Sequence, residues 1–334
     1  MLNKSKLRFG IIGTNTITDK IIEAGRLDPR FEISAVYSRT QERALAFAGK
    51  YQIPHTFTSL EEMAESQLID AAYIASPNSL HAPQSILFMN RGKHVLCEKP
   101  LASNAREVKA MIAAARRNNV TLMEAMKPTL TPNFKILMQA TKETGKIRRY
   151  FAAYCQYSSR YDALKEGNAP NAFKPELSNG ATMDIGIYCI YPMVVLFGKP
   201  EKIHATGIKL HTGVDGQASV IFEYKDMDAV VLYSKIADSY LPTEIQGENG
   251  TIISDRINII NNVKLRHKNG DEVQISKNQL DEYYYEIAEF IDLVSSGKPE
   301  SAINSHKNSL ITIEIIDEIR KQLGIVYPSD CRLM

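Results

Sequence analysis

The chain has 334 residues, of which 44% are hydrophobic, with 40 basic and 38 acidic side chains and a net charge of +2. This length and composition predict about two globular domains and exclude a disordered chain, a collagen-like chain and a small disulfide scaffold. The near-balance of charge, without a basic tract, argues against nucleic acid as a main partner.

Targeting and cysteine signals favour a cytoplasmic protein. No long apolar region or small-residue cleavage site follows Met1–Lys6, so we expect no signal peptide. The most apolar stretch, residues 185–198, is too short to span a membrane and predicts a buried helix. The cysteines lie far apart and lack His neighbours at ligand spacing, which predicts reduced thiols and no metal site. They are Cys97, Cys155, Cys189 and Cys331.

The first part of the chain alternates short apolar runs with helical patterns. The apolar runs are residues 7–12, 33–37, 71–75, 94–97 and 120–123. Between them, Ser59 and Asn104 each precede a Glu by three residues, the spacing of a capping box at a helix start. Alternation of strands and helices predicts an α/β domain over residues 1–127, with a doubly wound parallel sheet of the Rossmann type.

The pattern changes after residue 127. A strand-like run at 147–157 is followed by a polar loop at 162–180 and a buried helix at 184–197. Further strand-like runs follow at residues 202–208, 217–224, 229–235, 243–246, 250–260, 263–267 and 272–275. Two amphipathic helices close the chain. Strands grouped before helices predict an α+β domain over residues 128–334, with a large, mostly antiparallel open sheet.

The turn after the first strand is a weakened form of a dinucleotide-binding fingerprint. Such folds carry Gly-x-Gly-x-x-Gly or Ala, and here the chain reads Gly13-Thr14-Asn15-Thr16-Ile17-Thr18. Only Gly13 is kept. Asn15 tolerates positive φ, and its side chain either crowds a phosphate or hydrogen-bonds to it. We expect residues 13–17 to bind the cofactor phosphates, with an ordinary strand-to-helix turn as the alternative.

The end of the second strand bears on the choice of cofactor. An NAD site usually places Asp or Glu about 20 residues after the first Gly, to hold the ribose diol. The chain instead reads Ser38-Arg39-Thr40 there, without a carboxylate. Arg39 offers a fork suited to a 2′-phosphate, with Ser38 and Thr40 as additional donors. The pattern favours NADP(H), with NAD(H) as the alternative; a solvated surface arginine is the simplest competing interpretation.

Four separated segments resemble the signature segments of the Gfo/Idh/MocA oxidoreductases. They are Ile74–His81, Gly92–Pro100, Glu124–Met126 and Asn179–Tyr188. The last carries Asp-x-Gly-x-Tyr and looks like the branch of dimeric dihydrodiol dehydrogenase and glucose-fructose oxidoreductase. The resemblance covers nearly the whole chain. It implies an NAD(P)-dependent enzyme that moves a hydride to or from a sugar, polyol or related hydroxy or carbonyl compound.

The resemblance also implies a catalytic set. Lys99 matches the lysine of the Glu-Lys-Pro motif and is expected to accept or donate the hydroxyl proton, with Tyr188 sharing this work. Asp184 is expected to position substrate or Lys99, because its negative charge opposes proton loss from a neighbouring lysine. The simpler interpretations are a surface lysine, a core tyrosine and a helix-capping aspartate.

Further contacts follow from the same segments. Expected cofactor contacts beyond the first two turns are Ser76, Pro77, Asn78, His81, Glu98 and Lys99. For His81, a bond to the backbone in the first turn of a helix is an equal alternative, and for Glu98 the alternative is to cap the strand edge. Expected substrate contacts are Met126, Arg160, Asn171 and Phe173. Lys127 stands where relatives of this branch often carry an aromatic residue, so the substrate stays open.

Two rival functions remain at this point. One is a non-catalytic NAD(P)-binding sensor or regulator, which the eroded glycine turn favours. The other is a glycosidase that uses a tightly held NAD. The expected partners are a small-molecule substrate and a second copy of the chain, with no membrane. Alternating apolar residues at 218–224 and 229–235 lead us to expect a homodimer or larger homo-oligomer formed through the C-terminal sheet.

Overall fold

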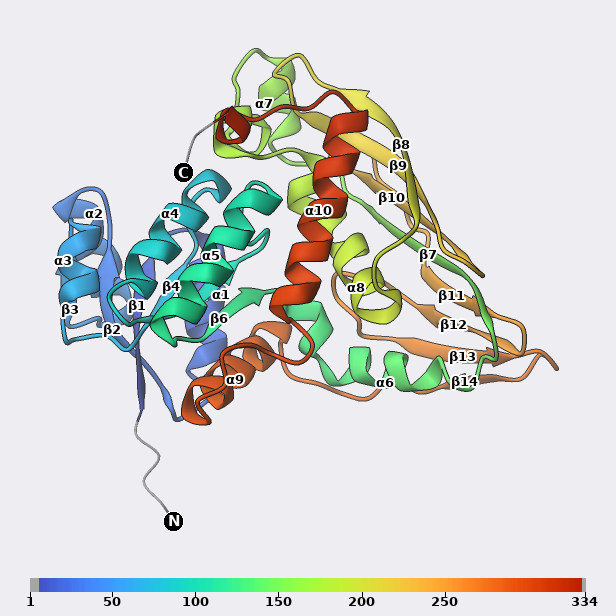
Figure 1. Cartoon of the computed structure of the whole chain (residues 1–334), viewed down its shortest axis with the longest axis horizontal. Coiled ribbons are helices and arrows are strands. Elements are labelled where there is room, and N and C mark those ends of the chain that lie inside the picture. Colours follow the sequence, from blue (N-terminus) through green and yellow to red (C-terminus); the bar gives the residue numbers. More distant parts are fainter. Residues whose placement is uncertain (1–5, 332–334) are drawn as a thin grey trace. The chain divides into compact units, whose positions relative to one another are not determined.

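A computed structural model describes residues 6–331, which divide into two compact units (Figure 1). The first unit holds residues 6–127 and 283–306, and the second holds 128–282 and 307–331. The chain passes from the first unit to the second after Lys127. Residues 283–306 differ from the expected consecutive domains, because they return to the first unit. The structure does not describe residues 1–5 and 332–334. The expectation of no signal peptide falls mainly on residues 1–5 and so lies outside the described residues.

The first unit is built on a six-stranded sheet in the order β3-β2-β1-β4-β5-β6, with all neighbours parallel. The strands are β1 (Leu7–Ile12), β2 (Phe31–Tyr37), β3 (His55–Phe57), β4 (Ala71–Ile74), β5 (His94–Glu98) and β6 (Leu122–Ala125). The helices are α1 (Thr16–Gly25), α2 (Gln41–Tyr51), α3 (Leu60–Glu65), α4 (Asn78–Met89), α5 (Ala105–Asn118) and α9 (Glu282–Ser295). The strand order reverses between β1 and β4, which confirms the doubly wound parallel sheet.

Burial and capping explain why these segments form the sheet and its helices. All four residues of β4 are buried, as expected for a parallel strand with helices on both faces. The predicted caps are confirmed: the side chains of Ser59 and Asn104 accept hydrogen bonds from the backbone N–H groups of Glu62 and Glu107. β3 was not predicted, because its three residues are too short to give a strand pattern.

The returning segment 283–306 completes the open edge of this sheet. β6 is the last strand, so one row of its backbone groups has no strand partner. The N–H of Leu122 donates to the carbonyl of Pro299 at 3.1 Å, and the Asn304 side chain donates to the carbonyl of Met126 at 3.1 Å. On α9, the Phe290 ring lies 5.8 Å from the ring of Phe9 in β1. Non-contiguous sequence thus supplies both core and edge of the first unit.

The second unit contains an eight-stranded sheet in the order β14-β13-β12-β11-β7-β10-β9-β8. Only β7 and β10 pair in parallel; the other neighbours are antiparallel, which confirms the predicted mostly antiparallel sheet. The strands are β7 (Ile147–Cys155), β8 (Lys202–Lys209), β9 (Asp215–Glu223), β10 (Asp228–Ser234), β11 (Thr243–Gly247), β12 (Gly250–Ser254), β13 (Val263–His267) and β14 (Glu272–Gln274).

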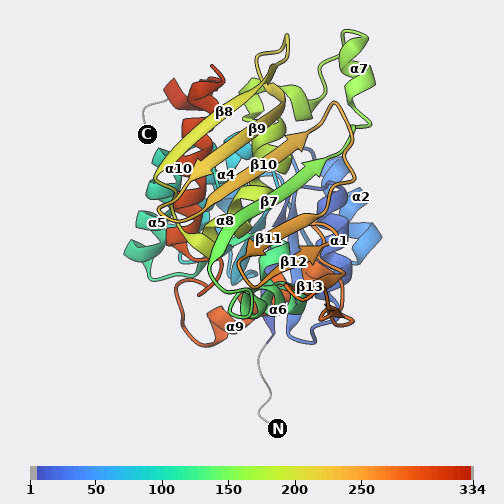
Figure 2. The same ribbon diagram turned by 90° about the vertical axis from the view of Figure 1, so that its right-hand side faces the viewer.

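Short helical elements connect and cover this sheet. They are η1 (Lys127–Leu130, which begins at the last residue of the first unit), α6 (Pro132–Ala140), α7 (Tyr161–Lys165), η2 (Asn171–Phe173), η3 (Pro175–Leu177), the π-helix η4 (Thr182–Gly186), α8 (Ile187–Phe197), α10 (His306–Gln322) and η5 (Pro328–Cys331). In Figure 2 the strands face the viewer and α8 and α10 lie behind them. The sheet therefore presents one broad face that the described residues of this unit do not cover.

The two faces of the sheet differ in chemistry. Along β9, buried Ala218, Val220 and Phe222 alternate with exposed residues that include Ile221. The outward positions also carry ion pairs between strands, such as Arg149–Asp228 at 2.7 Å. Period-2 alternation of this kind is typical of an antiparallel sheet with one packed and one solvent-facing side.

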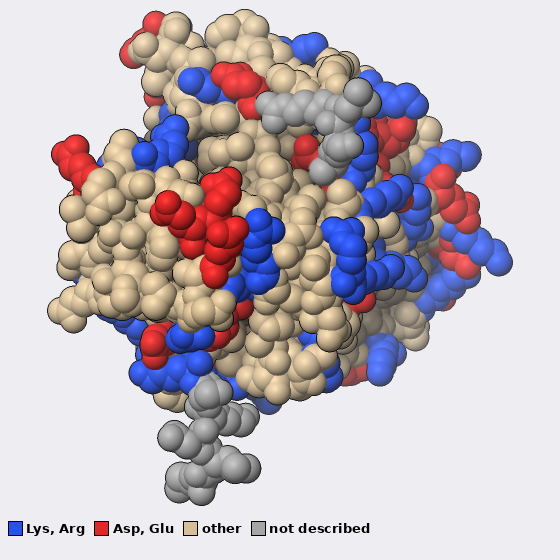
Figure 3. Space-filling model, turned by 60° about the vertical axis from the view of Figure 1, so that its left-hand side comes forward, with Lys and Arg blue, Asp and Glu red and all other residues tan. Residues whose placement is uncertain are grey.

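The apolar stretch before and within α8 is a core element. Pro175–Phe197 is long and apolar enough to cross a membrane by length and composition, but 72% of its most apolar window is buried inside the protein. α8 forms the buried helix expected for this region: the Tyr150 hydroxyl donates to the carbonyl of Cys189 at 3.0 Å. Elsewhere, basic and acidic side chains both occur across the face drawn in Figure 3.

Candidate active site

Gly13 forms the tight turn between β1 and α1. Its φ is +111°, and a Cβ atom at this position would collide with the backbone carbonyl of Ala75, which follows β4. Only glycine therefore allows the turns after β1 and β4 to approach each other so closely. The turn lies where the strand order reverses, the place where open α/β sheets bind ligands.

Asn15 departs from the expected conformation. Its φ is −109°, so the turn does not use positive φ there, and the residue is the N-cap of α1. The side-chain oxygen accepts from the N–H groups of Ile17 at 3.0 Å and Thr18 at 3.1 Å, and its amide donates to the carbonyl of Ala75 at 2.8 Å. Asn15 replaces the second glycine by fastening the turn to the neighbouring strand end.

Thr18 occupies the third position of the fingerprint without opening the turn. It is fully buried, and its hydroxyl donates to the carbonyl of Gly13 at 2.8 Å. The extra side-chain volume is therefore used to close the strand-to-helix connection. Asn15 and Thr16 are exposed and Thr14 and Ile17 partly exposed, so the expected phosphate-binding turn remains open to a ligand.

The turn after β2 keeps Arg39 at the surface. Ser38 is buried, whereas Arg39 and Thr40 are exposed, and the Thr40 hydroxyl caps α2 by accepting from the Arg43 N–H. Within residues 6–331 no ion pair is recorded for Arg39. Its guanidinium is accordingly available to an anionic ligand at the carboxyl edge of the sheet.

His81 ties two strand ends together. It is buried in α4; its Nδ1 lies 2.9 Å from the carbonyl of Pro100 and its Nε2 lies 2.8 Å from the carbonyl of Ser76. Burial lowers the pKa of His81, and the two carbonyl contacts oppose that change. A neutral ring has one N–H, so it donates to one carbonyl at a time. The geometry corresponds to the backbone-bonding alternative of the sequence analysis.

The Glu98-Lys99-Pro100 segment begins at the last residue of β5, on the same edge of the sheet. The Tyr73 hydroxyl of β4 donates to the Glu98 carboxylate at 2.6 Å. Burial raises the pKa of Glu98, while the Tyr73 bond and the charge of Lys99 oppose the rise. The Lys99–Pro100 peptide is cis, and both Glu98 and Lys99 are partly exposed. Tyr73 thus holds the Glu98 side chain on one side of Lys99, and His81 holds the Pro100 carbonyl on the other.

A buried hydrogen-bond chain anchors the start of η4 in the second unit. The Thr182 N–H and hydroxyl both donate to one oxygen of Asp215, at 2.7 and 2.6 Å. The Tyr233 hydroxyl lies 2.8 Å from the Thr182 hydroxyl, which can accept from it. Burial raises the pKa of Asp215, and the Thr182 bonds oppose the rise. Gly180, at φ +135°, is required because a Cβ would meet this carboxylate.

Asp184 and Tyr188 share the one open side of this segment. From residue 181 to residue 194 they are the only two partly exposed positions. The four-residue spacing places them on one face, as expected. Gly186 lies between them, and the Tyr233 ring packs against it, 3.0 Å from where a Cβ would stand. The Tyr188 ring contacts that of Tyr154 edge-on, 5.8 Å between centroids.

Lys235 is a site residue that the sequence analysis missed. Its ammonium forms an ion pair with Asp184, and it lies 5.3 Å from the centre of the Phe173 ring. It directly follows β10, in which Ala229, Val231 and Tyr233 face inward. Lys235 is the next alternate residue and therefore also faces inward. A lysine at an inward position, where an apolar residue is expected, was the sequence signal that could have identified it.

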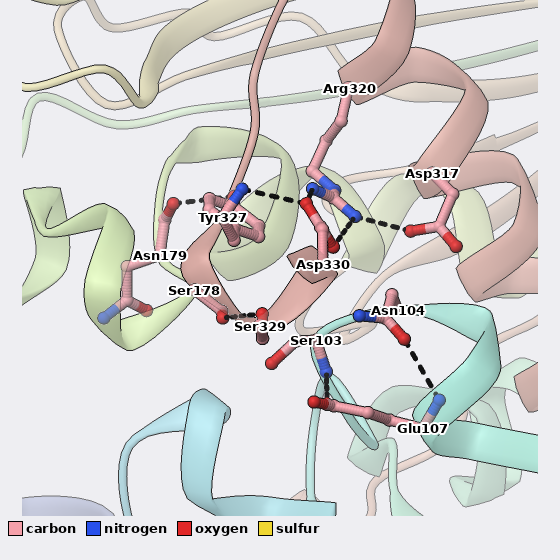
Figure 4. A network of polar contacts seen from close by, with 10 residues as sticks. All are labelled: Ser103, Asn104, Glu107, Ser178, Asn179, Asp317, Arg320, Tyr327, Ser329 and Asp330. Carbon is pink, nitrogen blue, oxygen red and sulfur yellow. Dashed lines mark hydrogen bonds and ion pairs between the residues drawn. The ribbon is translucent and has the colours of Figure 1, made fainter. Parts of the chain in front are cut away.

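The turn before η4 is also held from the C-terminal region (Figure 4). Ser178 has a left-handed backbone, φ +56°, and its hydroxyl lies 3.1 Å from that of Ser329 in η5. The Tyr327 hydroxyl donates to the carbonyl of Asn179 at 2.8 Å, and the Arg320 guanidinium lies 4.4 Å from the Tyr327 ring centre. The segment bearing Asp184 is thus fixed at its beginning by residues about 150 positions later in the chain.

The expected substrate residues fall into two groups. Met126 and Phe173 are fully buried, and Phe173 lies beneath Lys235. Arg160 and Asn171 are exposed, and the carbonyl of Asn171 accepts from the Asn179 side chain at 2.7 Å. Across residues 6–331 no group of three or more His, Cys, Asp or Glu side chains is arranged to hold a metal ion.

A doubly wound sheet with a tight glycine turn at its switch point, joined to an open antiparallel sheet unit, defines the class of a two-unit nucleotide-binding oxidoreductase. The chain belongs to the Gfo/Idh/MocA family: residues 7–126 match the model of the oxidoreductase family with an NAD-binding Rossmann fold, and residues 138–253 match the family's C-terminal domain. The predicted family and enzyme class are thereby confirmed.

Individual relatives cover almost the whole chain. It is 52% identical to the scyllo-inositol 2-dehydrogenase (NADP(+)) IolU of Bacillus subtilis over 97% of this chain and 99% of that protein. It is 35% identical to the trans-1,2-dihydrobenzene-1,2-diol dehydrogenase of Danio rerio, with the same shares covered. The solved structure of KijD10, a 3-ketoreductase from Actinomadura kijaniata in complex with NADP and TDP-benzene, has the same fold, with a TM-score of 0.84 at 21% identity over 97% and 99% of the two chains.

Proposed function

We propose that this chain is an NADP(H)-dependent oxidoreductase that interconverts a hydroxyl and a carbonyl group on a polyol or related compound. The observation that carries the proposal is its 52% identity, over nearly its full length, to a relative named as an NADP(+)-dependent dehydrogenase of a cyclic polyol. Lys99, Asp184 and Tyr188, in the family's segments, supply the acid–base and positioning groups that such a reaction needs.

The first unit fits a dinucleotide phosphate. Gly13 gives the close turn, and the backbone of Thr14, Asn15 and Thr16 offers N–H groups at the start of α1. The N–H of Ile17 donates to the Asn15 side chain, so Ile17 is proposed to line the turn. Ser38, Arg39 and Thr40 are the donors proposed for a 2′-phosphate, which favours NADP(H) over NAD(H). When bound, the nicotinamide cofactor supplies or accepts the hydride. Ser76, Pro77, Asn78 and Glu98 are proposed to shape the adjoining part of this site, with His81 supporting it through the backbone.

The protein residues carry the proton. Lys99 is proposed to take the proton of the reacting hydroxyl on oxidation and to return it on reduction, and Tyr188 is proposed to share this acid–base work. Asp184 is proposed to orient the substrate. Arg160 and Asn171, which are exposed, and the buried Met126 and Phe173 remain proposed determinants of substrate fit.

A spectrophotometric screen tests this function. Purified protein is mixed with NADP⁺ or NAD⁺ and with scyllo-inositol, trans-1,2-dihydrobenzene-1,2-diol or a panel of sugars, and reduced cofactor is followed. We expect oxidation of a polyol with preference for NADP⁺. Cofactor binding without turnover of any hydroxy or carbonyl compound would favour the sensor instead, and release of sugar from a glycoside without net cofactor reduction would favour the glycosidase.

We also propose that the protein is a cytoplasmic homodimer or larger homo-oligomer. The uncovered face of the eight-stranded sheet, with Ile208 and Ile221 each 48% exposed, supports association through that sheet. Four free cysteines support a reducing compartment. A monomer by light scattering at micromolar concentration would contradict the oligomer, and fractionation of cells tests the compartment.

A further inference from the structure

The second unit contains a lysine in an environment that most lysines avoid. The Lys235 side chain is only 5% exposed, whereas that of its partner Asp184 is 38% exposed. Lys and Asp are rarely buried unless they are paired, because burying a charge without a partner is costly. The pair is therefore oriented, with its cation in the interior and its carboxylate toward the open side of the segment.

Several contacts fix the position of this cation. The Phe173 ring lies on one side, at 5.3 Å from the ammonium, a distance typical of a cation–π contact. The Lys235 backbone is held as well, because its N–H donates to the carbonyl of Gly216 and its carbonyl accepts from the N–H of Ser158. The positive charge of Lys235 also acts on the buried Asp215. A held cation of this kind fixes the carboxylate with which it pairs.

The chemistry of an ionised carboxylate determines what Asp184 can recognise. Such a group only accepts hydrogen bonds, and charge-assisted bonds are about twice as strong as neutral ones. A hydroxyl of the substrate is therefore the matching donor. Tyr188, the other partly exposed residue of the segment, lies one turn away on the same face. Two side chains so placed are suited to two neighbouring oxygens of one molecule.

We propose that Lys235 is a positioning residue that fixes the Asp184 carboxylate, so that Asp184 binds the hydroxyl adjacent to the one being oxidised. On this account, a compound that lacks the adjacent hydroxyl is oxidised poorly. This inference rests on the proposed function and adds to it the group that selects the substrate.

The test is the selectivity between two substrates, measured in the full-length protein. The better polyol from the screen is compared with its analogue that lacks the hydroxyl adjacent to the oxidised carbon, and kcat/KM is determined for both. The ratio of the two values does not depend on the fraction of active enzyme, so general loss of folding does not change it. We expect wild-type protein to prefer the polyol by at least about 100-fold, as sites built to bind a hydroxyl do.

Lys235→Met is expected to reduce this preference below about tenfold, mainly through kcat/KM of the polyol, because a displaced polar group costs on the order of 100-fold. Lys235→Arg, which keeps the charge, should restore most of the ratio. Lys202→Met is the matched control, since Lys202 forms an exposed ion pair with Glu223 in the same sheet; its ratio should equal that of the wild type. If Lys235→Met is insoluble, Lys235→Gln is measured in its place.

A double variant tests whether Lys235 acts through Asp184. Asp184→Asn should also lower the preference, and Lys235→Met combined with Asp184→Asn should lower it no further, because both changes remove the same interaction. A Lys235→Met protein that still rejects the deoxy analogue overturns the inference alone. Additive losses in the double variant also overturn it. Wild-type protein that oxidises no polyol overturns the proposed function and this inference together.

Discussion

The two units assemble their candidate site residues in different ways. In the first unit, Gly13, Ser76 and Lys99 each follow a parallel strand closely, so one edge of the sheet gathers them. In the second unit, Asp184 depends on Lys235, 51 residues later, and Thr182 depends on Asp215, 33 residues later. Sites at strand ends can be found by counting along a sequence, whereas sites built from tertiary pairs need the register of a sheet.

Replacing Lys99 tests the first unit's part in proton transfer with the largest expected effect. Lys99→Met should lower kcat/KM for the polyol by about 10²–10⁴-fold, the usual loss when an acid–base group is removed. NADPH affinity, followed by nicotinamide emission because the protein has no Trp, should be retained. Lys50→Met, at an exposed lysine paired with Asp19, is the control. Unchanged turnover in Lys99→Met would show that the strand-end motif does not supply the base.

Replacing Phe290 tests whether the returning segment belongs to the core of the first unit. The side chain is fully buried and its ring packs against Phe9. Phe290→Ala should lower the free energy of unfolding by about 3–5 kcal/mol, because it leaves a cavity. Leu45→Ala, at a residue 55% exposed in α2, should change it by less than about 0.5 kcal/mol. Urea unfolding measures the free energy of unfolding of both variants. Equal changes in the two variants would show that α9 does not belong to this core.

Replacing Arg39 tests the prediction that the residues after the second strand bind the 2′-phosphate of NADP(H). Arg39→Ala should weaken NADPH binding by about 10–100-fold, since a hydrogen-bonded charge contributes about 1.5–3 kcal/mol, and should leave NADH binding unchanged. Arg91→Ala removes the same charge from the opposite end of the first unit's strands, before β5, and should affect neither cofactor. Titration by nicotinamide emission gives both affinities, and parallel losses for the two cofactors would contradict a role in binding the 2′-phosphate.

The buried carboxylate of the second unit gives a smaller effect with a defined sign. Burial raises the pKa of Asp215 in the folded protein. As pH rises above about 3.8, the unfolded chain loses this proton first, so the contribution of Asp215 to stability falls until the folded pKa is passed. The stability of Asp215→Asn relative to wild type should therefore rise with pH, by at most about 1.4 kcal/mol per pH unit.

Urea unfolding of both proteins from pH 4 to pH 7 measures this change. Asp226→Asn serves as the control, because Lys146 lowers the pKa of that exposed carboxyl and reverses the sign of its pH dependence. If the difference in free energy of unfolding between wild type and Asp215→Asn stays constant from pH 4 to pH 7, the raised pKa of Asp215 is contradicted.

The fold class, the Rossmann-type strands and the capped helices could be predicted from the sequence, because these features follow from local patterns. It missed features set by long-range contacts. Asn15 was expected to tolerate positive φ, yet it caps α1 and bonds to Ala75, a contact 60 residues away. Lys235 was counted within a strand pattern, but its partner could not be known before β10 and η4 were placed together. The first of the two closing amphipathic helices was predicted from apolar residues at positions 280, 284, 287, 291 and 294, but that pattern does not indicate which unit the helix covers.

The discontinuous first unit sets an order of events during synthesis. Thr121 at the edge of its sheet bonds to the carbonyl of Lys298, 177 residues later. At about 5–20 residues per second, a ribosome needs roughly 10–35 s to translate the intervening chain. Throughout that interval the nascent Rossmann sheet has an uncovered edge and lacks the Phe290 packing of its core. Chaperones that shield unpaired strands could bind the uncovered edge during this interval, before the second unit is complete.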